Sequence, residues 1–279
     1  MKPIISAQDL LNLFSNTIIL FDATNTPNAR EDYLKGHLKR AHFIDINTEL
    51  ADIKENLKHG GRHPLPTLEQ FSKVLSKFCV LPDSHIIIYD HMSGANAAAR
   101  FWWMLKAVGH EKVQVLDGGI QKAIEIGFPV SSDKEKPTRK SNYTCKSWNL
   151  PINTINSVEK ASNNKDNFII DVREAVRYNG EMEPFDPIAG HIPNAHNIPF
   201  SENLNKDGFF LTQEELRKKY EPLFNEYHPN NIIVHCGSGV TACQTLLAMD
   251  FAGFDIPNLY VGSWSEWCRN NKKMILKKE

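Results

Sequence analysis

Long apolar runs are scarce in this sequence of 279 residues. Runs such as residues 17–21 and 101–105 fall far short of the ~18 residues that a membrane-spanning helix needs, so we expect no membrane segment. An excess of either charge is also missing, because 32 Lys and Arg are balanced by 33 Asp and Glu. This balance excludes nucleic acid and anionic membranes as expected partners and leaves small molecules or proteins.

Cysteine is sparse as well. The chain has five, at Cys79, Cys145, Cys236, Cys243 and Cys268. Their odd number, wide spacing and lack of any C-x-x-C pair argue against a disulfide framework and against a structural metal, so we predict free thiols. The N-terminal residues turn polar before an apolar signal-peptide core could form, which predicts a cytoplasmic protein.

The sequence repeats itself. An apolar run before Asp22 has its counterpart before Asp171, 149 residues later, and a run before Asp90 has its counterpart before Cys236, 146 residues later. Gly-His pairs, helical runs and Gly-rich turns recur in the same order in both halves. A near-constant offset of this kind predicts two copies of one fold.

Within each copy, short β-branched runs alternate with amphipathic helical stretches. This pattern predicts an α/β fold, in which each copy is a mostly parallel sheet flanked by helices on both faces. Ligands of such sheets bind at the carboxyl ends of the strands. The polar stretch that begins at residue 131 is the natural linker, so we predict a first domain at 1–130, a linker at 131–149 and a second domain at 150–279.

The most informative segment follows the apolar run at 232–235. Cys236 comes directly after this run, and a short loop separates it from a helical stretch. The loop consists of Gly237, Ser238, Gly239, Val240 and Thr241. Two glycines let successive N–H groups converge on one point, and the positive end of the following helix adds to their field, so the loop can stabilise a thiolate or a bound anion. We therefore predict a nucleophilic Cys236 with the loop residues as substrate-binding groups.

Two alternatives accompany this interpretation. Free cysteine is among the most buried residue types, so Cys236 could be an ordinary core residue. A cysteine phosphatase would need C-x5-R, in which the arginine grips phosphate oxygens, but the sixth position beyond Cys236 is Ala242. The first copy has Asp90 at the matching position, and a carboxylate cannot perform thiol chemistry, so we expect only the second copy to be active.

These residues carry a resemblance. The loop 236–242, the stretch 116–119, and the stretches 190–193 and 262–267 resemble those of two-domain sulfurtransferases of the rhodanese superfamily. The loop is most similar to that of the 3-mercaptopyruvate branch. The resemblance implies tandem rhodanese-like domains and a cycle in which Cys236 takes sulfane sulfur from 3-mercaptopyruvate or thiosulfate, becomes a persulfide, and passes the sulfur on. It implies no metal and no organic cofactor.

The same resemblance implies partners and site residues. The donor would be a small sulfur-bearing anion, and the acceptor cyanide, a low-molecular-weight thiol or a reduced thioredoxin-like protein. Arg177 matches the arginine that binds the donor's anionic group, while Asp171 and Arg173 would hold the loop. Ser238 and His63 match two members of a Ser-His-acid relay that handles the proton of the pyruvate enolate.

Two positions depart from the family pattern. Asn47 stands where the relay acid is expected, which leaves His63 without a charged partner unless Asp45 substitutes. Phe185 stands where the 3-mercaptopyruvate branch usually has a second arginine, and the loss of one bidentate contact to a carboxylate would weaken donor binding ~10- to 100-fold. A persulfide carrier or docking module that turns over no small donor is the alternative function.

Overall fold

The chain forms two compact units. The computed structural model describes residues 1–14, 17–137 and 141–276. Unit 1 comprises Met1–Ala51, Pro66–Asn149 and Lys206–Phe210, and unit 2 comprises Asp52–Leu65, Leu150–Asn205 and Leu211–Glu279. Each half of the sequence therefore gives a short segment to the unit of the other half, which the linear boundaries at 130 and 150 do not anticipate.

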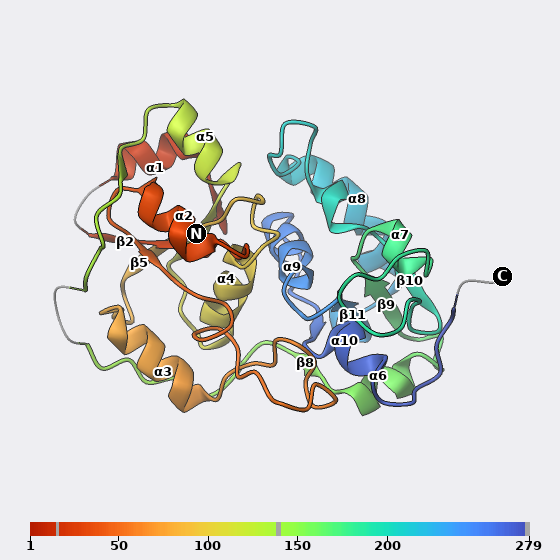
Figure 1. Cartoon of the computed structure of the whole chain (residues 1–279). Coiled ribbons are helices and arrows are strands. Elements are labelled where there is room, and N and C mark those ends of the chain that lie inside the picture. Colours follow the sequence, from red (N-terminus) through yellow and green to blue (C-terminus); the bar gives the residue numbers. More distant parts are fainter. Residues whose placement is uncertain (15–16, 138–140, 277–279) are drawn as a thin grey trace. The chain divides into compact units, whose positions relative to one another are not determined.

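Unit 1 is built on a parallel sheet with the order β1-β6-β5-β2-β4 (Figure 1). Its elements, in chain order, are β1 (Ile4–Ile5), α1 (Ala7–Leu13), β2 (Ile18–Asp22), α2 (Ala29–Lys35), β3 (His37–Leu38), β4 (Ala41–Phe43), α3 (Leu68–Lys77), β5 (His85–Tyr89), α4 (Ala98–Ala107), β6 (Val113–Leu116), α5 (Gly119–Glu125) and β7 (Val130–Ser131). β3 and β7 pair antiparallel outside the main sheet.

Helices cover both faces of this sheet. Side chains alternate between the faces of a strand, so Leu20 and Phe21 of β2 point to opposite sides. Leu20 belongs to a core that includes residues of α1 and α5. Phe21 packs edge-on against Phe101 of α4, which in turn meets Phe71 of α3. Burial on both faces is the reason that β2 and β5 read as continuous apolar runs in the sequence.

Unit 2 has a second parallel sheet, with the order β10-β9-β11-β12-β8. Its elements, in chain order, are β8 (Ile152–Asn153), α6 (Ile155–Ala161), β9 (Phe168–Asp171), α7 (Ala175–Tyr178), β10 (Ala195–Asn197), the 3-10 turn η1 (Phe200–Asn203), α8 (Gln213–Glu226), η2 (Pro229–Asn231), β11 (Ile232–His235), α9 (Ala242–Phe251), β12 (Asn258–Tyr260) and α10 (Ser263–Trp267). Residues of α6 and α10 share one core with β9, β11 and β12.

The two sheets have the same strand order once the matching strands are compared. β4, β2, β5, β6 and β1 of unit 1 correspond to β10, β9, β11, β12 and β8 of unit 2. The predicted fold class, two α/β copies with parallel sheets flanked by helices, is confirmed. The strand that precedes Asp90 in unit 1, β5, and the strand that precedes Cys236 in unit 2, β11, each lie at the centre of their sheet.

Much of the predicted linker is bonded to unit 1. The N–H groups of Tyr143 and Cys145 donate to the hydroxyls of Ser76 and Ser72 on α3, and that of Asn149 donates to the carbonyl of Ala107. Residues 138–140 of the linker lie outside the described residues.

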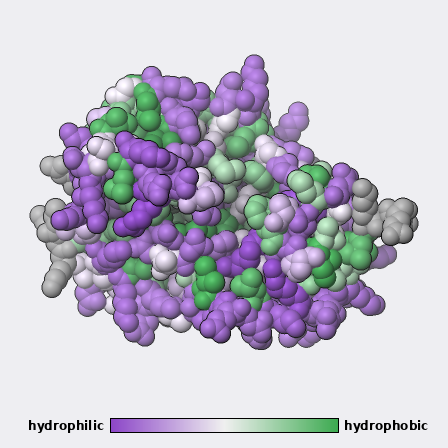
Figure 2. Space-filling model, in the orientation of Figure 1, coloured by the Kyte–Doolittle hydropathy of each residue, from purple (hydrophilic) through white to green (hydrophobic). Residues whose placement is uncertain are grey.

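None of the helices in the described part of the chain has the length and apolar character needed to cross a membrane. The face shown in Figure 2 is mostly hydrophilic, with small hydrophobic groups scattered over it.

Candidate active site

Cys236 lies at the carboxyl end of the central strand β11, at the start of the loop that leads into α9. Its N–H donates to Oγ of Ser263 at 3.2 Å, and its carbonyl accepts from the N–H of Trp264 at 3.0 Å. The residue is 2% exposed. These bonds to the start of α10 fix the backbone from which the thiol projects.

Gly239 has a conformation that only glycine adopts without strain, with φ at +72°. A Cβ on this residue would lie 2.4 Å from the carbonyl oxygen of Val261, so the loop packs against backbone. The contact uses main-chain atoms of Val261.

The loop keeps backbone donors available. No hydrogen bond joins the N–H groups of Gly237, Ser238 or Val240 to any other described residue. Thr241, at the N-cap of α9, makes no side-chain capping bond. Unpaired N–H groups at the start of a helix can bind an anion, and substrate binding by the loop stays a prediction.

Two guanidinium groups lie against the start of this loop. A Cβ on Gly237 would be 3.1 Å from Nη2 of Arg177 and 3.1 Å from Nη2 of Arg62. Arg177 comes from α7, where sequence reasoning placed the anion-binding arginine. Arg62 comes from the segment Asp52–Leu65, which joins unit 2 although it belongs to the first half of the sequence.

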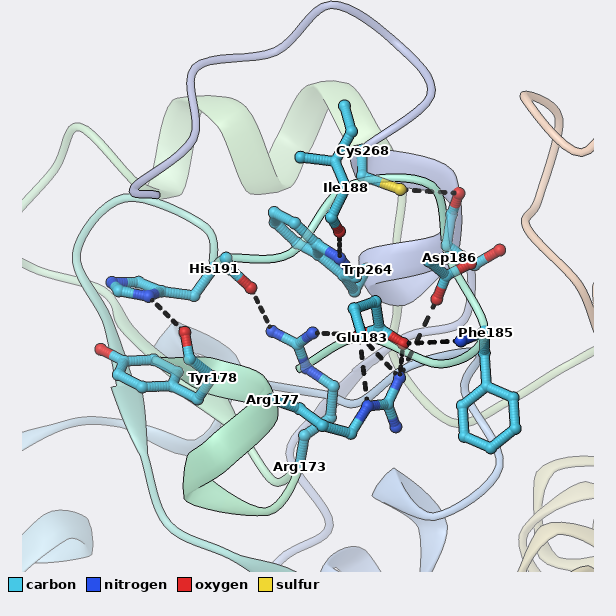
Figure 3. Close-up of polar contacts among 12 residues, drawn as sticks. Arg173, Arg177, Tyr178, Glu183, Phe185, Asp186, Ile188, His191, Trp264 and Cys268 are labelled. Carbon is cyan, nitrogen blue, oxygen red and sulfur yellow. Dashed lines mark hydrogen bonds and ion pairs between the residues drawn. The ribbon is translucent and has the colours of Figure 1, made fainter. Parts of the chain in front are cut away.

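Carboxylates hold these arginines in place, and Figure 3 shows Glu183 and Asp186 beside Arg177. Glu183 accepts from Nη2 of Arg177 at 2.7 Å, and its other oxygen pairs with Arg173 at 3.1 Å. Asp186, whose side chain is fully buried, pairs with Arg62 and, at 2.7 Å, with Arg269. Burial acts to raise the pKa of Asp186, but Arg62 and Arg269 outweigh it and hold the pKa below its usual value.

Phe185 lies on the outside of this cluster. Its ring centroid is 5.1 Å from the Arg177 guanidinium carbon and 5.5 Å from that of Arg62, within the range of cation–π contacts. The residue is 62% exposed. Figure 3 shows its ring projecting beside the Arg177 guanidinium.

Asp171 and Arg173 form the buried base of the site. Arg173 donates to both carboxylate oxygens of Asp171 and to the carbonyl of Gly190, and its guanidinium lies over the Trp264 ring. Burial acts to raise the pKa of Asp171, but Arg173 and His235 outweigh it and lower the pKa. These contacts connect the pair to Gly190 and Trp264, and its role in holding the loop stays a prediction. Burial also lowers the pKa of His235.

Ser238 and His63 are brought together in unit 2. Oγ of Ser238 lies 2.9 Å from Nδ1 of His63, although the two are 175 residues apart in sequence. Asp45, the suggested substitute acid, accepts the N–H groups of Asn47 and Thr48 at 2.7 and 3.0 Å and so caps a turn in unit 1. Its carboxylate therefore has a local structural role.

In unit 1, the loop after β5 holds Asp90 at the position of Cys236. The Asp90 carboxylate accepts the N–H groups of Met92, Gly94, Asn96 and Ala98 at 2.8–3.1 Å. Burial raises the pKa of Asp90 in spite of these four donors. The first copy thus fills its own anion cradle with a side chain.

Sequence reasoning missed two contributors. Arg62 was part of the segment that contained His63, but only its proximity to Gly237 in the folded unit marks it as part of the site. Ser263, which orients Cys236, has a φ of 53°, unusual for a residue other than glycine. Its counterpart in unit 1, Gly119, also has a positive φ. The recurrence of a Gly-rich turn at this place in both halves of the sequence could have pointed to Ser263.

Within the described residues, no group of three His, Cys, Asp or Glu side chains could hold a metal ion.

Comparison with known proteins supports the same family. The Rhodanese-like domain model matches residues 6–125 and 154–270. The 3-mercaptopyruvate sulfurtransferase of Escherichia coli is 36% identical over 245 residues, covering 86% of this chain and 83% of the relative. The human 3-mercaptopyruvate sulfurtransferase is 33% identical over 247 residues, covering 86% of this chain and 80% of the relative.

A solved structure agrees with these sequences. SseA from Escherichia coli, described as a 3-mercaptopyruvate sulfotransferase with the rhodanese fold, has a TM-score of 0.77 and 31% identity, and the match covers 95% of this chain and all of that one (100%). The resemblance found in the loop at Cys236 is therefore confirmed over nearly the whole sequence. The chain is a member of the rhodanese family with two rhodanese-like domains.

Proposed function

We propose that the chain is a sulfurtransferase that moves sulfane sulfur from 3-mercaptopyruvate or thiosulfate through a Cys236 persulfide to a thiol or cyanide. The observation that carries the proposal is the placement of Cys236 before the uncapped N-terminus of α9, with the Arg177 guanidinium against the next residue. The names of the relatives support it.

Two half-reactions make up the cycle. The Cys236 thiolate attacks the donor's sulfur, the bond from that sulfur to carbon or to sulfonate sulfur breaks with its electron pair, and a persulfide forms. With 3-mercaptopyruvate the leaving group is an enolate, which takes up a proton to become pyruvate. The acceptor then attacks the outer sulfur, and the Cys236 thiolate leaves.

The loop N–H groups stabilise the persulfide anion in this scheme, and Arg177 binds the anionic group of the donor. Ser238 and His63, 2.9 Å apart, deliver the proton to the enolate. The first copy, with Asp90 in its loop, takes no part in the chemistry. The physiological acceptor, whether a low-molecular-weight thiol or a reduced thioredoxin-like protein, and a location in the cytoplasm belong to the same proposal.

The test is turnover with each donor and with cyanide or a thiol as acceptor. We expect wild-type protein to turn over, Cys236→Ser to be inactive, and intact mass spectrometry to show one added sulfur atom only when Cys236 is present. Cys145→Ser, in unit 1, is the matched control and keeps the adduct. Turnover by Cys236→Ser contradicts the assignment of the nucleophile.

The proposed proton delivery by Ser238 and His63 predicts a difference between the two donors. His63→Gln lowers kcat with 3-mercaptopyruvate about 100-fold, the scale of general acid catalysis, and leaves thiosulfate turnover within a few-fold, because only the keto acid leaves as an enolate. Equal losses with both donors would remove the proton-delivery role. A sulfur adduct without multiple turnover with either donor would favour the persulfide carrier instead.

A further inference from the structure

We propose that Arg62 is a second donor-binding residue, which forms with Arg177 a two-arginine site for the carboxylate of a keto-acid donor. The proposal rests on the sulfurtransferase function and deepens it. It assigns to this chain an anion-binding residue that comes from the first half of the sequence and stands in for the arginine replaced by Phe185.

Arg62 and Arg177 occupy equivalent positions beside the loop. Nη2 of Arg62 and Nη2 of Arg177 each lie 3.1 Å from the place that a Cβ on Gly237 would occupy. Gly237 directly follows the nucleophile, so both guanidinium groups border the space beside Cys236. A Cβ there would crowd both guanidinium groups, which would have to move by a few tenths of an ångström.

Neighbouring side chains hold Arg62 in this place. Its Nη1 pairs with the buried carboxylate of Asp186, and the ring of Phe185 lies against its guanidinium. Phe185 contacts Arg177 in the same way, so one ring sits against both arginines. The side chains of Arg62 and Arg177 remain 22% and 17% exposed. Each guanidinium is thus anchored on one side and open on the other, as a binding residue requires.

The charges around the site also favour anions. The cluster contains four arginines, Arg62, Arg173, Arg177 and Arg269, and three carboxylates, Asp171, Glu183 and Asp186. The one positive charge that remains balances the Cys236 thiolate, which interacts with Arg173. The accessible sides of the Arg62 and Arg177 guanidinium groups can each take one oxygen of a planar carboxylate.

The experiment compares the KM for 3-mercaptopyruvate in wild type, Arg62→Ala, Arg62→Lys and Arg177→Ala, with cyanide as acceptor. We expect Arg62→Ala to raise this KM about 10- to 100-fold with kcat changed only a few-fold, because one charge-assisted contact is lost. Arg62→Lys keeps the charge and the pairing with Asp186, so a partial recovery is expected. Arg217→Ala, an exposed arginine on α8, serves as the control with an unchanged KM.

A rescue variant separates binding from folding. Phe185→Arg restores an arginine where the 3-mercaptopyruvate branch usually has one, so the double variant Arg62→Ala/Phe185→Arg should recover much of the lost donor affinity. If Arg62→Ala keeps the wild-type KM, the proposal is overturned. It is also overturned if the KM rises in Arg62→Ala and neither Arg62→Lys nor Phe185→Arg lowers it, since the effect is then structural.

A binding measurement distinguishes failure of the site from failure of the function. Calorimetric binding of pyruvate to Cys236→Ser needs no turnover. Weaker binding to Cys236→Ser/Arg62→Ala supports the two-arginine site even if wild type turns over neither donor, a result that would defeat only the proposed function. Equal pyruvate binding by the two variants overturns the site even if the wild type is an active sulfurtransferase.

Discussion

The loops after β5 and β11 stand at the same place in two sheets of the same strand order, yet they are filled differently. In unit 1, four backbone N–H groups converge on the Asp90 carboxylate of the loop itself. In unit 2, Cys236 occupies that position, and the N–H groups of Gly237, Ser238 and Val240 have no partner within the described residues. The anion cradle is thus a property of the fold, and the residue at its centre decides whether it is filled or available.

Two buried carboxylates show what surrounds each loop. Burial raises the pKa of Asp90 although four backbone dipoles face it, whereas arginines lower the pKa of Asp186 although it is buried as well. At Asp186 the guanidinium groups of Arg62 and Arg269 outweigh the effect of burial, whereas at Asp90 the four backbone N–H groups do not. Unit 1 also has no equivalent of Arg177, because an offset of 149 residues places Asn28 at that position.

The largest expected effect comes from giving the loop of unit 2 the residue that unit 1 has at the matching position, Asp90. Cys236→Asp should reduce turnover to the assay background, because a carboxylate has no nucleophilic sulfur and the loop N–H groups now bind it. Its free energy of unfolding, measured with urea, should be at least that of Cys236→Ser, since a carboxylate has two oxygens that can accept several of these N–H groups whereas the serine hydroxyl has one. A Cys236→Asp protein less stable than Cys236→Ser would contradict the equivalence of the two loops.

The reverse conversion should gain no activity. Asp90→Cys in a Cys236→Ser background is expected to show neither turnover nor a sulfur adduct, because Asn28 and Thr24 stand where unit 2 has Arg177 and Arg173. Asp90→Cys should also lower the free energy of unfolding by about 1–3 kcal/mol, as buried N–H groups lose their acceptor. Turnover in this double variant would mean that the cradle alone suffices for the chemistry.

A smaller effect is expected at the residue that orients Cys236. Ser263→Ala removes the hydroxyl that accepts the Cys236 N–H and should cost about 1 kcal/mol of unfolding free energy with a lower kcat. Ser263→Gly copies Gly119 of unit 1 and relieves the positive φ, so it should cost less stability than alanine while losing the same hydroxyl. Equal stability of Ser263→Ala and wild type would remove the hydroxyl's role.

The smallest effects are opposite dependences on pH. Because the pKa of Asp90 is raised by burial, its proton stabilises the fold at low pH, and wild type should lose stability relative to Asp90→Asn as the pH rises above about 4. Because the pKa of Asp186 is lowered, wild type should lose stability relative to Asp186→Asn as the pH falls below about 4. Each tenfold difference in proton affinity is worth about 1.4 kcal/mol. Urea unfolding at several pH values measures both, and slopes of the same sign would contradict the contrast.

Much of this site could be predicted from local sequence. Short-range rules predict a strand from the apolar run before Cys236, a loop from the two glycines after it, and a helix from the stretch beyond. The Asp90 found at the matching position of the first copy predicted that only the second copy is active. The pairing of Ser238 with His63, 175 residues away, was suggested only by family resemblance. The structure brings their atoms within hydrogen-bond distance, and their role remains a prediction.

Arg62 and the exchanged segments could not be predicted in this way. No periodicity or motif links Arg62 to Gly237, because their proximity depends on Asp52–Leu65 packing with the second half of the chain. From the sequence, Phe185 was interpreted as the loss of a substrate-binding arginine. In the folded unit its ring lies against the guanidinium groups of Arg62 and Arg177. A motif compares residues at the same sequence position, so it registers Phe185 as a departure. It does not register that the Arg62 guanidinium, from a distant part of the sequence, lies beside the same loop.

The sequence by itself determined the duplication, the parallel α/β architecture and the Cys236 loop. These features depend on residues that are close together in the sequence: apolar runs form buried strands, glycines form turns, and the residues after a turn begin a helix. Only the tertiary structure decided which charges surround that loop. Electrostatic attraction falls with distance through space rather than along the chain, so the four arginines and three carboxylates of unit 2 become one cluster only after residues 62, 171–186 and 269 have folded together.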